Sequence, residues 1–222
     1  MDWTALALSL QLAAITVTLL LPIGVLVGRT LAYRSFPGKG VAEALVALPL
    51  VLPPTVFGYY LLVALGSASP IGRLWYDVFG RPLVFTFEGL VVASLIFNLP
   101  FAIQPMQRAF EAIPRHVREA APCCGMSPWR TLWRIELALA WPGILTGMVL
   151  SFAKTLGEFG IVLMIGGSIP GETRTIAISI YDRVQAFDDA AAGKMSALLL
   201  AISLVAITLT FASSRRIGRR LD

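Results

Sequence analysis

Lys154 and Glu158 are the two charged residues in a long apolar stretch of the sequence, residues 137–165. A charge at the centre of a lipid bilayer costs about 2.5–3.5 kcal/mol on insertion scales, so such residues usually face protein or water. Because they are four positions apart, they share one face of a helix. Two interpretations stay open: a structural ion pair, or a polar cavity in which Lys154, with Ser151 and Thr155, attracts an anion that Glu158 keeps weakly bound.

No set of residues typical of an enzyme or a metal site is found. His116 is the only histidine, so a cluster with metal-ligand spacing cannot be assembled. Cys123 and Cys124 are adjacent, in a loop that we place in the cytoplasm, where thiols stay reduced. The glycine-lysine segments 38–40 and 193–195 lack the neighbours of a phosphate-binding loop. We expect no catalytic residue, metal or cofactor on this chain, and ATP, if used, must bind another chain.

The composition is that of an integral membrane protein. Apolar residues make up 57%, charged residues 14%, and the mean hydropathy is +0.77. A membrane-spanning helix needs roughly 20 mostly apolar residues. We predict an all-α, multi-pass protein with one transmembrane domain, residues 6–212, and five spans, at about residues 5–28, 44–66, 88–107, 137–165 and 194–214. The first span lacks a preceding basic region, so we expect it to remain in the mature protein rather than to be a cleaved signal peptide.

The distribution of basic residues predicts the orientation, because lysine and arginine are retained on the cytoplasmic side. Twelve basic residues follow the first, third and fifth spans: Arg29, Arg34, Lys39, Arg108, Arg115, Arg118, Arg130, Arg134, Arg215, Arg216, Arg219 and Arg220. Five lie on the other side, among seven acidic residues: Arg73, Arg81, Arg174, Arg183 and Lys194. The N-terminus is thus outside, and residues 213–222 form a basic cytoplasmic tail. This topology and anionic lipid explain the net charge of +5, so we expect no nucleic-acid partner.

The connection over residues 108–136 is longer than a turn between spans requires. Pro114, Pro122 and Pro128 divide it, which favours two short helices joined by a turn at Gly125. The alternative is an amphipathic segment on the lipid headgroups, anchored by two tryptophans. In span two, prolines at positions 49, 53 and 54 predict a kink, either beside a pathway or as a packing feature. The small-residue spacings Gly24/Gly28 and Gly143/Gly147 are a weak indication of close helix packing.

The connection also resembles the cytoplasmic coupling motif of ABC importer permeases. The matching residues are Glu119, Ala120, Ala121, Gly125, Ile135 and Leu137. The chain departs from the motif at Ala138, where proline is usual, although Pro142 lies downstream. The resemblance implies that the helix containing Glu119 docks into a groove of a cytoplasmic ATPase subunit, which binds ATP and Mg, while this chain is not itself an enzyme.

Four further stretches resemble the molybdate permease subfamily: residues 36–39, 47–59, 151–160, and 169–175 followed by Tyr181. The resemblance covers nearly the whole chain. It implies a multi-pass protein of the bacterial cytoplasmic (inner) membrane that forms a homodimer and binds two ATPase subunits. It also implies an oxyanion-binding protein outside, for which Glu172 and Arg174 are candidate docking residues.

The expected substrate is molybdate, with tungstate or sulfate and thiosulfate as close alternatives, because these oxyanions are similar in shape and charge. A gradient-driven transporter or a membrane enzyme would normally have ionisable residues in several spans. Only Lys154 and Glu158 lie deep in a span here. A structural scaffold would leave the coupling motif unexplained.

Overall fold

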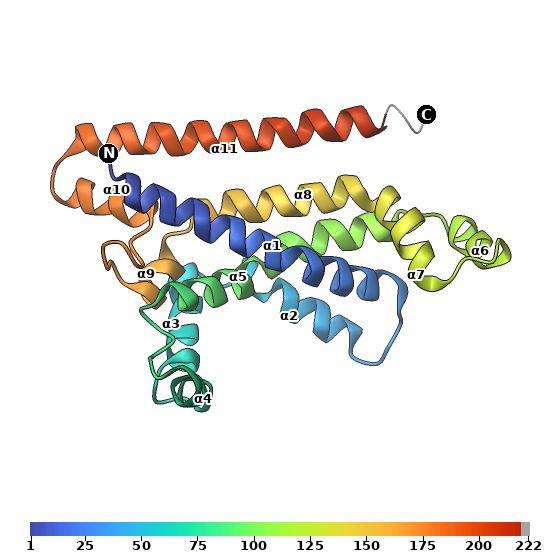
Figure 1. The fold of residues 1–222 in the computed structure, drawn as a ribbon, viewed down its shortest axis with the longest axis horizontal. Coiled ribbons are helices and arrows are strands. Elements are labelled where there is room, and N and C mark those ends of the chain that lie inside the picture. Colours follow the sequence, from blue (N-terminus) through green and yellow to red (C-terminus); the bar gives the residue numbers. More distant parts are fainter. Residues whose placement is uncertain (219–222) are drawn as a thin grey trace.

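The computed structural model describes residues 1–218, and for residues 209–218 it describes the backbone alone. All regular elements of this part of the chain are helical. The predicted basic tail falls mostly where little is described: residues 213–218 continue the last helix, and residues 219–222 lie outside the described residues. The helices, shown in Figure 1, are α1 (Trp3–Tyr33), α2 (Lys39–Val51), α3 (Pro54–Leu65), α4 (Pro70–Phe79), α5 (Phe87–Glu111), α6 (Arg115–Cys123), α7 (Pro128–Thr131), the π-helix η1 (Leu132–Glu136), α8 (Leu137–Leu156), α9 (Gly160–Gly166), α10 (Ile176–Gln185) and α11 (Asp189–Gly218).

Four helical runs within the described residues are long and apolar enough to cross a membrane: Trp3–Tyr33, Phe87–Glu111, Pro128–Leu156 and Asp189–Thr208. The pair α2 and α3 passes the same test if it is counted as one span. The structure therefore has four or five candidate spans. The helix ends are set locally: the carboxylate of Asp2 accepts the amide of Ala5 at 2.9 Å, and the hydroxyl of Thr86 accepts the amide of Gly89 at 3.2 Å.

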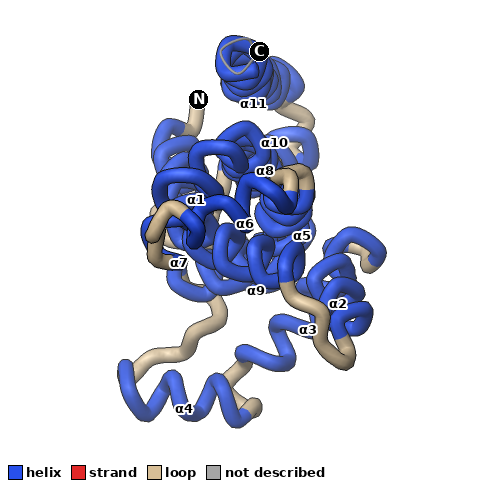
Figure 2. Tube along the Cα trace, turned by 90° about the vertical axis from the view of Figure 1, so that its right-hand side faces the viewer, coloured by secondary structure: helices blue, strands red, loops and turns tan. Residues whose placement is uncertain are grey.

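The centre of the molecule is a bundle of α1, α5 and α8, packed lengthwise (Figures 1 and 2). Glycines let the outer two helices approach α5. A Cβ atom added to Gly28 of α1 would lie 3.0 Å from the backbone nitrogen of Gln107, and one added to Gly147 of α8 would lie 2.9 Å from the carbonyl oxygen of Ala102. The close packing that the glycine spacing indicated is confirmed, and its partner on both sides is α5.

Two hydrophobic clusters fill this bundle at different depths. One lies towards the N-terminal end of α1 and includes Leu12, Phe97 and Ile165. The other lies towards the C-terminal ends of α1 and α5 and includes Met106 and Phe110, both fully buried. Between the two clusters lie the fully buried polar residues Thr16 of α1 and Asn98 of α5. Helix α11 lies on one flank, against α8 and α10.

The predicted second span is sharply bent. Helices α2 and α3 meet at Leu52 and Pro53 with a bend of 115°. Pro54 occupies the first position of α3 and cannot donate a backbone hydrogen bond, and Pro53 before it has extended backbone dihedrals. The kink that the prolines predicted is confirmed, and it is large enough to make two separate helices.

The predicted fourth span, residues 137–165, is also divided. Helix α8 ends at Leu156, and α9 begins at Gly160. At Phe159 the backbone leaves the helical region, with φ −120° and ψ −55°. The apolar pattern predicted one continuous span here. The helix is interrupted at residues 157–159, which contain a glycine and a buried carboxylate.

The glycine packing generates the first prediction. Gly147→Ala should lower the free energy of unfolding by about 1–3 kcal/mol, the usual cost of an extra methyl group in a packed core, because it must displace the backbone of α5. The control is Gly193→Ala on α11, where an added Cβ meets nothing within 4 Å and alanine should raise helix stability by about 1 kcal/mol. Thermal unfolding in detergent measures both. Equal effects of the two substitutions would contradict the assigned packing.

Candidate functional site

The two helix breaks lie against each other. An added Cβ at Gly160, the first residue of α9, would lie 3.0 Å from the Cβ of Pro54, the first residue of α3. One added at Gly58 would lie 2.9 Å from the Cβ of Met164, further along the same two helices. Broken helices are tolerated inside a membrane only where the freed backbone groups are buried in protein or line a water-filled cavity. The paired breaks are therefore a candidate for part of a pathway.

Lys154 and Glu158 lie at this junction. The Nζ atom of Lys154 donates to Oε2 of Glu158 at 2.7 Å, and it lies 5.0 Å from the ring centroid of Phe97 on α5. The side chain of Glu158 is 3% exposed, whereas that of Lys154 is 35% exposed. The predicted pair is thus present, with its carboxylate inside the protein and its ammonium at the surface of the subunit.

The two hydroxyl residues near this pair face the interior instead. Ser151 and Thr155 are buried, and the hydroxyl of Thr155 donates to the carbonyl oxygen of Ser151 at 2.8 Å. The Ser151 hydroxyl has no hydrogen-bond partner in the described part of the chain. Of the four residues predicted for a translocation path, Lys154 is the one whose side chain is partly exposed.

The predicted coupling segment forms a helix, a turn and a helix, as its prolines indicated. Pro114 precedes α6, and Pro128 is the first residue of α7. Pro122 does not divide the segment, because it lies in the last turn of α6, where its carbonyl oxygen accepts the amide of Gly125 at 2.9 Å. This bond shares the turn with another, from the amide of Met126 to the carbonyl oxygen of Ala121 at 3.1 Å.

These two bonds form a Schellman motif, the usual way to satisfy the last carbonyl groups of a helix. The motif needs a left-handed residue after the helix, and Gly125 supplies it with φ +70°. Apart from its two chain neighbours, no described residue comes within 4 Å of the Cβ position at Gly125, so the backbone conformation rather than space requires glycine there. The position of Gly125, six residues after Glu119, therefore determines where α6 ends.

The coupling residues are exposed to different degrees. Glu119 and Ala120 are exposed, and the carboxylate of Glu119 has no hydrogen-bond or ion-pair partner in the described part of the chain. Ala121 is buried, so it seats α6 on its own subunit. Ile135 and Leu137 are half-buried beyond the turn, at the junction of η1 and α8. Most residues of α6 are thus exposed, and its exposed face carries one unpaired carboxylate, that of Glu119.

Sequence reasoning missed an ion pair at the same end of the molecule. Arg29 of α1 donates to both carboxylate oxygens of Glu136, at 2.5 and 3.2 Å, and the side chain of Glu136 is almost fully buried. A paired acidic residue in η1 therefore joins the start of α8 to α1. The available signal was an arginine near the end of one span and an acidic residue at the start of another, on the same side of the membrane.

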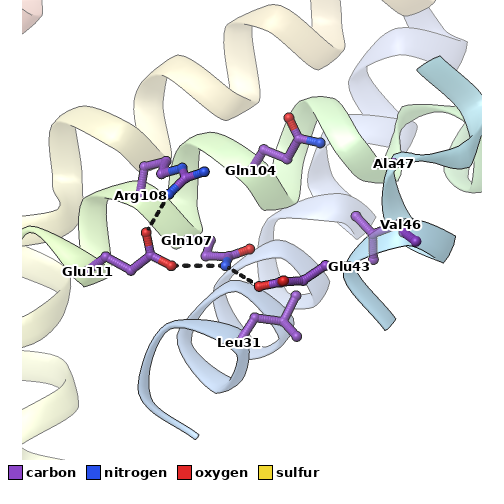
Figure 3. A pocket seen from close by; sticks show the side chains of 9 residues that line it. Leu31, Glu43, Val46, Ala47, Gln104, Gln107, Arg108 and Glu111 are labelled. Carbon is purple, nitrogen blue, oxygen red and sulfur yellow. Dashed lines mark hydrogen bonds and ion pairs between the residues drawn. The ribbon is translucent and has the colours of Figure 1, made fainter. Parts of the chain in front are cut away.

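A polar pocket of about 450 Å³ was missed as well. It lies between α2 and α5, near the end of α1 (Figure 3). The amide nitrogen of Gln107 donates to Glu43 of α2 at 2.9 Å and to Glu111 at 3.0 Å, and Arg108 pairs with Glu111 at 3.0 Å. One amide thus holds two carboxylates of different helices together and ties α2 to the bundle.

At the opposite end, the two candidate docking residues differ in availability. Arg174 donates to the hydroxyl and carbonyl oxygens of Ser168, at 3.0 and 3.3 Å, and lies 3.7 Å from the carboxylate of Asp182 on α10. It therefore fastens the outer loop to its own subunit. Glu172 is exposed, and no partner for its side chain occurs among the described residues.

This chain belongs to the family of binding-protein-dependent transport system inner membrane components, whose model matches residues 21–222. It is a multi-pass inner-membrane protein. Over 96% of its length, it is 45% identical to the molybdenum transport system permease protein ModB of Azotobacter vinelandii, 95% of which is covered. It is 35% identical to ModB of Escherichia coli (strain K12), over 94% of this chain and 92% of that protein. Identity to the sulfate transport system permease protein CysT of the same strain is 32%, over 89% of this chain and 71% of that protein.

Solved structures have the same fold. The chain matches a bacterial alginate ABC transporter, solved in complex with an alginate-bound periplasmic protein, with a TM-score of 0.76 at 17% identity over 96% of this chain and 78% of that one. It matches the MetNI methionine ABC transporter, in an inward-facing conformation, with a TM-score of 0.70 at 17% identity over 97% of this chain and 94% of that one. The predicted ABC importer permease fold is confirmed.

The ion pair at the helix break generates the second prediction. Lys154→Met leaves the buried Glu158 carboxylate without its partner and should lower the free energy of unfolding by about 3–5 kcal/mol. Glu158→Gln should cost less, because the ammonium of Lys154 is partly exposed. The double variant should recover part of the loss, as measured by thermal unfolding of both single variants and the double variant. Strictly additive losses would argue against a stabilising pair.

Proposed function

We propose that this chain is the membrane-spanning subunit of an ATP-driven importer that carries molybdate across the inner membrane. The observation that carries the substrate assignment is the 45% identity to a molybdenum permease over nearly the full length of both chains. Sulfate is the second candidate, because a sulfate permease also matches, at lower identity. The chain itself performs no covalent step, so its contribution is a pathway and its control.

The proposed topology has five spans, with α2 and α3 counted as one, the N-terminus outside and the C-terminus inside. Helices α6 and α7 lie at one end of the bundle, which is also the end towards which α11 runs, whereas the N-terminus, α9 and α10 lie at the other (Figure 1). Most basic residues belong to the first of these ends. The positive-inside rule therefore supports an inner position for α6.

The proposed assembly contains two copies of this chain, two cytoplasmic ATPase subunits that bind ATP and Mg, and an oxyanion-binding protein outside. The exposed face of α6 with its unpaired Glu119 supports an ATPase contact. The outer loop with Glu172 is the proposed contact for the binding protein, and the neighbouring Arg174 holds that loop in shape. ATP binding would open the path outwards, and hydrolysis would return it to the inward-open state.

The ammonium of Lys154 has a defined role in this scheme. It lies at the junction of two broken helices, with its charge at the surface of the subunit. A doubly charged oxyanion crossing there gains an attractive interaction, and the nearby Glu158 carboxylate keeps that attraction weak. Passage rather than tight binding is the expected result.

The deciding experiment is uptake by proteoliposomes that contain this chain, its ATPase and its binding protein. We expect ATP-dependent uptake of labelled molybdate that resists excess unlabelled sulfate. Uptake that sulfate or tungstate abolishes would retain the importer and reassign its substrate. Transport without any ATPase would instead indicate a gradient-driven transporter.

The exposed carboxylate of the coupling helix gives a further prediction. Glu119→Lys should reduce co-purification of the ATPase and ATP-dependent uptake at least about tenfold, because it reverses the charge of the exposed, unpaired carboxylate on α6. Membrane insertion should be unchanged. The control is Asp77→Lys, an equal charge reversal at an exposed site of α4 near the other end. Wild-type uptake by the Glu119 variant would refute the coupling role.

A further inference from the structure

Tyr33, the last residue of α1, lies where the coupling helix meets the bundle. Its ring lies edge to face against Phe110 of α5, with centroids 5.9 Å apart. The guanidinium carbon of Arg118, on α6, lies 3.8 Å from the centre of the ring, and that of Arg29 lies 5.5 Å from it. One aromatic ring thus touches side chains of α1, α5 and α6.

The contact between Arg118 and Tyr33 is made through the face of the ring. Both Nε of Arg118 and the hydroxyl oxygen of Tyr33 are buried, and neither has a hydrogen-bond partner in the described part of the chain. A guanidinium within 6 Å of an aromatic centroid is attracted by the electrons of the ring, more strongly when water is excluded. The ring rather than the hydroxyl therefore holds Arg118, which is the residue next to Glu119.

The second arginine extends this contact to another span. Arg29 pairs through both carboxylate oxygens with Glu136, which ends the π-helix η1 at the start of α8. Single π-turns inside helices frequently mark functional positions. Two guanidinium groups share the Tyr33 ring, and the buried Glu136 carboxylate offsets their mutual repulsion. A displacement of Arg118 changes the charge environment of the Arg29–Glu136 pair and hence of the junction between η1 and α8.

We propose that Tyr33 is a positioning residue that transmits movement of the coupling helix α6 to spans α1 and α8, through Arg118 on one side and the Arg29–Glu136 pair on the other. This inference rests on the proposed importer function. Because α6 presents mostly exposed side chains, the stacked Arg118 is a mechanical link between the ATPase-facing helix and the bundle. Tyr33 itself contacts neither substrate nor nucleotide.

The test compares two substitutions of one side chain. Tyr33→Leu removes the aromatic face but keeps an apolar side chain, and Tyr33→Phe removes only a hydroxyl that makes no hydrogen bond. In proteoliposomes with the ATPase and binding protein, Tyr33→Leu should lower uptake per ATP hydrolysed about fivefold, the factor expected for loss of the close Arg118 cation–π contact. Assembly and ATP hydrolysis should stay within about twofold of wild type, as should every property of Tyr33→Phe.

Arg118 provides the matching change on the other side of the contact. Arg118→Met keeps a long, apolar side chain without charge and should lower uptake per ATP as Tyr33→Leu does. The double variant should be no worse than Tyr33→Leu alone, because that variant has already lost the contact that Arg118→Met removes. Additive losses, or a fall in uptake that merely follows loss of assembly, would overturn the proposal.

A local measurement separates this inference from the substrate assignment. Cys123 and Cys124 are both free and exposed at the end of α6. In the assembled complex, with Cys123→Ser, a spin label on Cys124 should become more mobile when Tyr33→Leu is added and should not change with Tyr33→Phe. An unchanged label in Tyr33→Leu would refute the link through Tyr33, whatever ion is transported. Absence of molybdate uptake by the wild-type complex, with the label responding as expected, would refute only the proposed function.

Discussion

The close approach of α1 and α8 to α5 positions every other part of this subunit. Lipid provides no hydrophobic driving force between spans, so backbone-to-backbone packing at glycines must supply the contact. Gly28 and Gly147 place two helices against the backbone of α5. Because that central contact is tight, the ends of the same helices are fixed. Tyr33 and Glu136 both contact Arg29 at one end, and Lys154 and Glu158 lie at the other.

Two kinds of irregularity are concentrated at the ends of this bundle. At one end, α3 and α9 begin beside each other after breaks in two different spans. At the other end, the buried carboxylate of Glu136 in the π-helix η1 contacts Arg29 of α1. Regular helix runs between them. In the proposed mechanism, a movement of α6 acts on the bundle at the end that contains the π-helix. At the other end, the backbone at the paired breaks can rearrange without loss of the central packing.

Composition and local chemistry were sufficient to predict much of this structure. Uncharged runs predicted the spans, and proline positions predicted both the bend in span two and the start of α6. Long-range pairings could not be predicted. Arg29 and Glu136 are 107 positions apart. The sequence around Arg29 indicates only the membrane orientation, and the sequence around Glu136 indicates only the end of a loop. The break near Gly157 was hidden because Lys154 and Glu158 have helical spacing. The contacts of Arg174, a candidate docking residue, with Ser168 and Asp182 were not predicted either.

The bend between α2 and α3 also limits how much of the bilayer this part of the chain can cross. The 13 residues of α2 span about 20 Å, at 1.5 Å per residue, whereas the hydrocarbon layer is about 30 Å thick. With a bend of 115°, α3 does not continue along the axis of α2. The span that we propose for α2 and α3 together is therefore not one straight helix, and its break lies between them. Lipid cannot border exposed backbone breaks, so this break must face neighbouring protein or a water-filled vestibule.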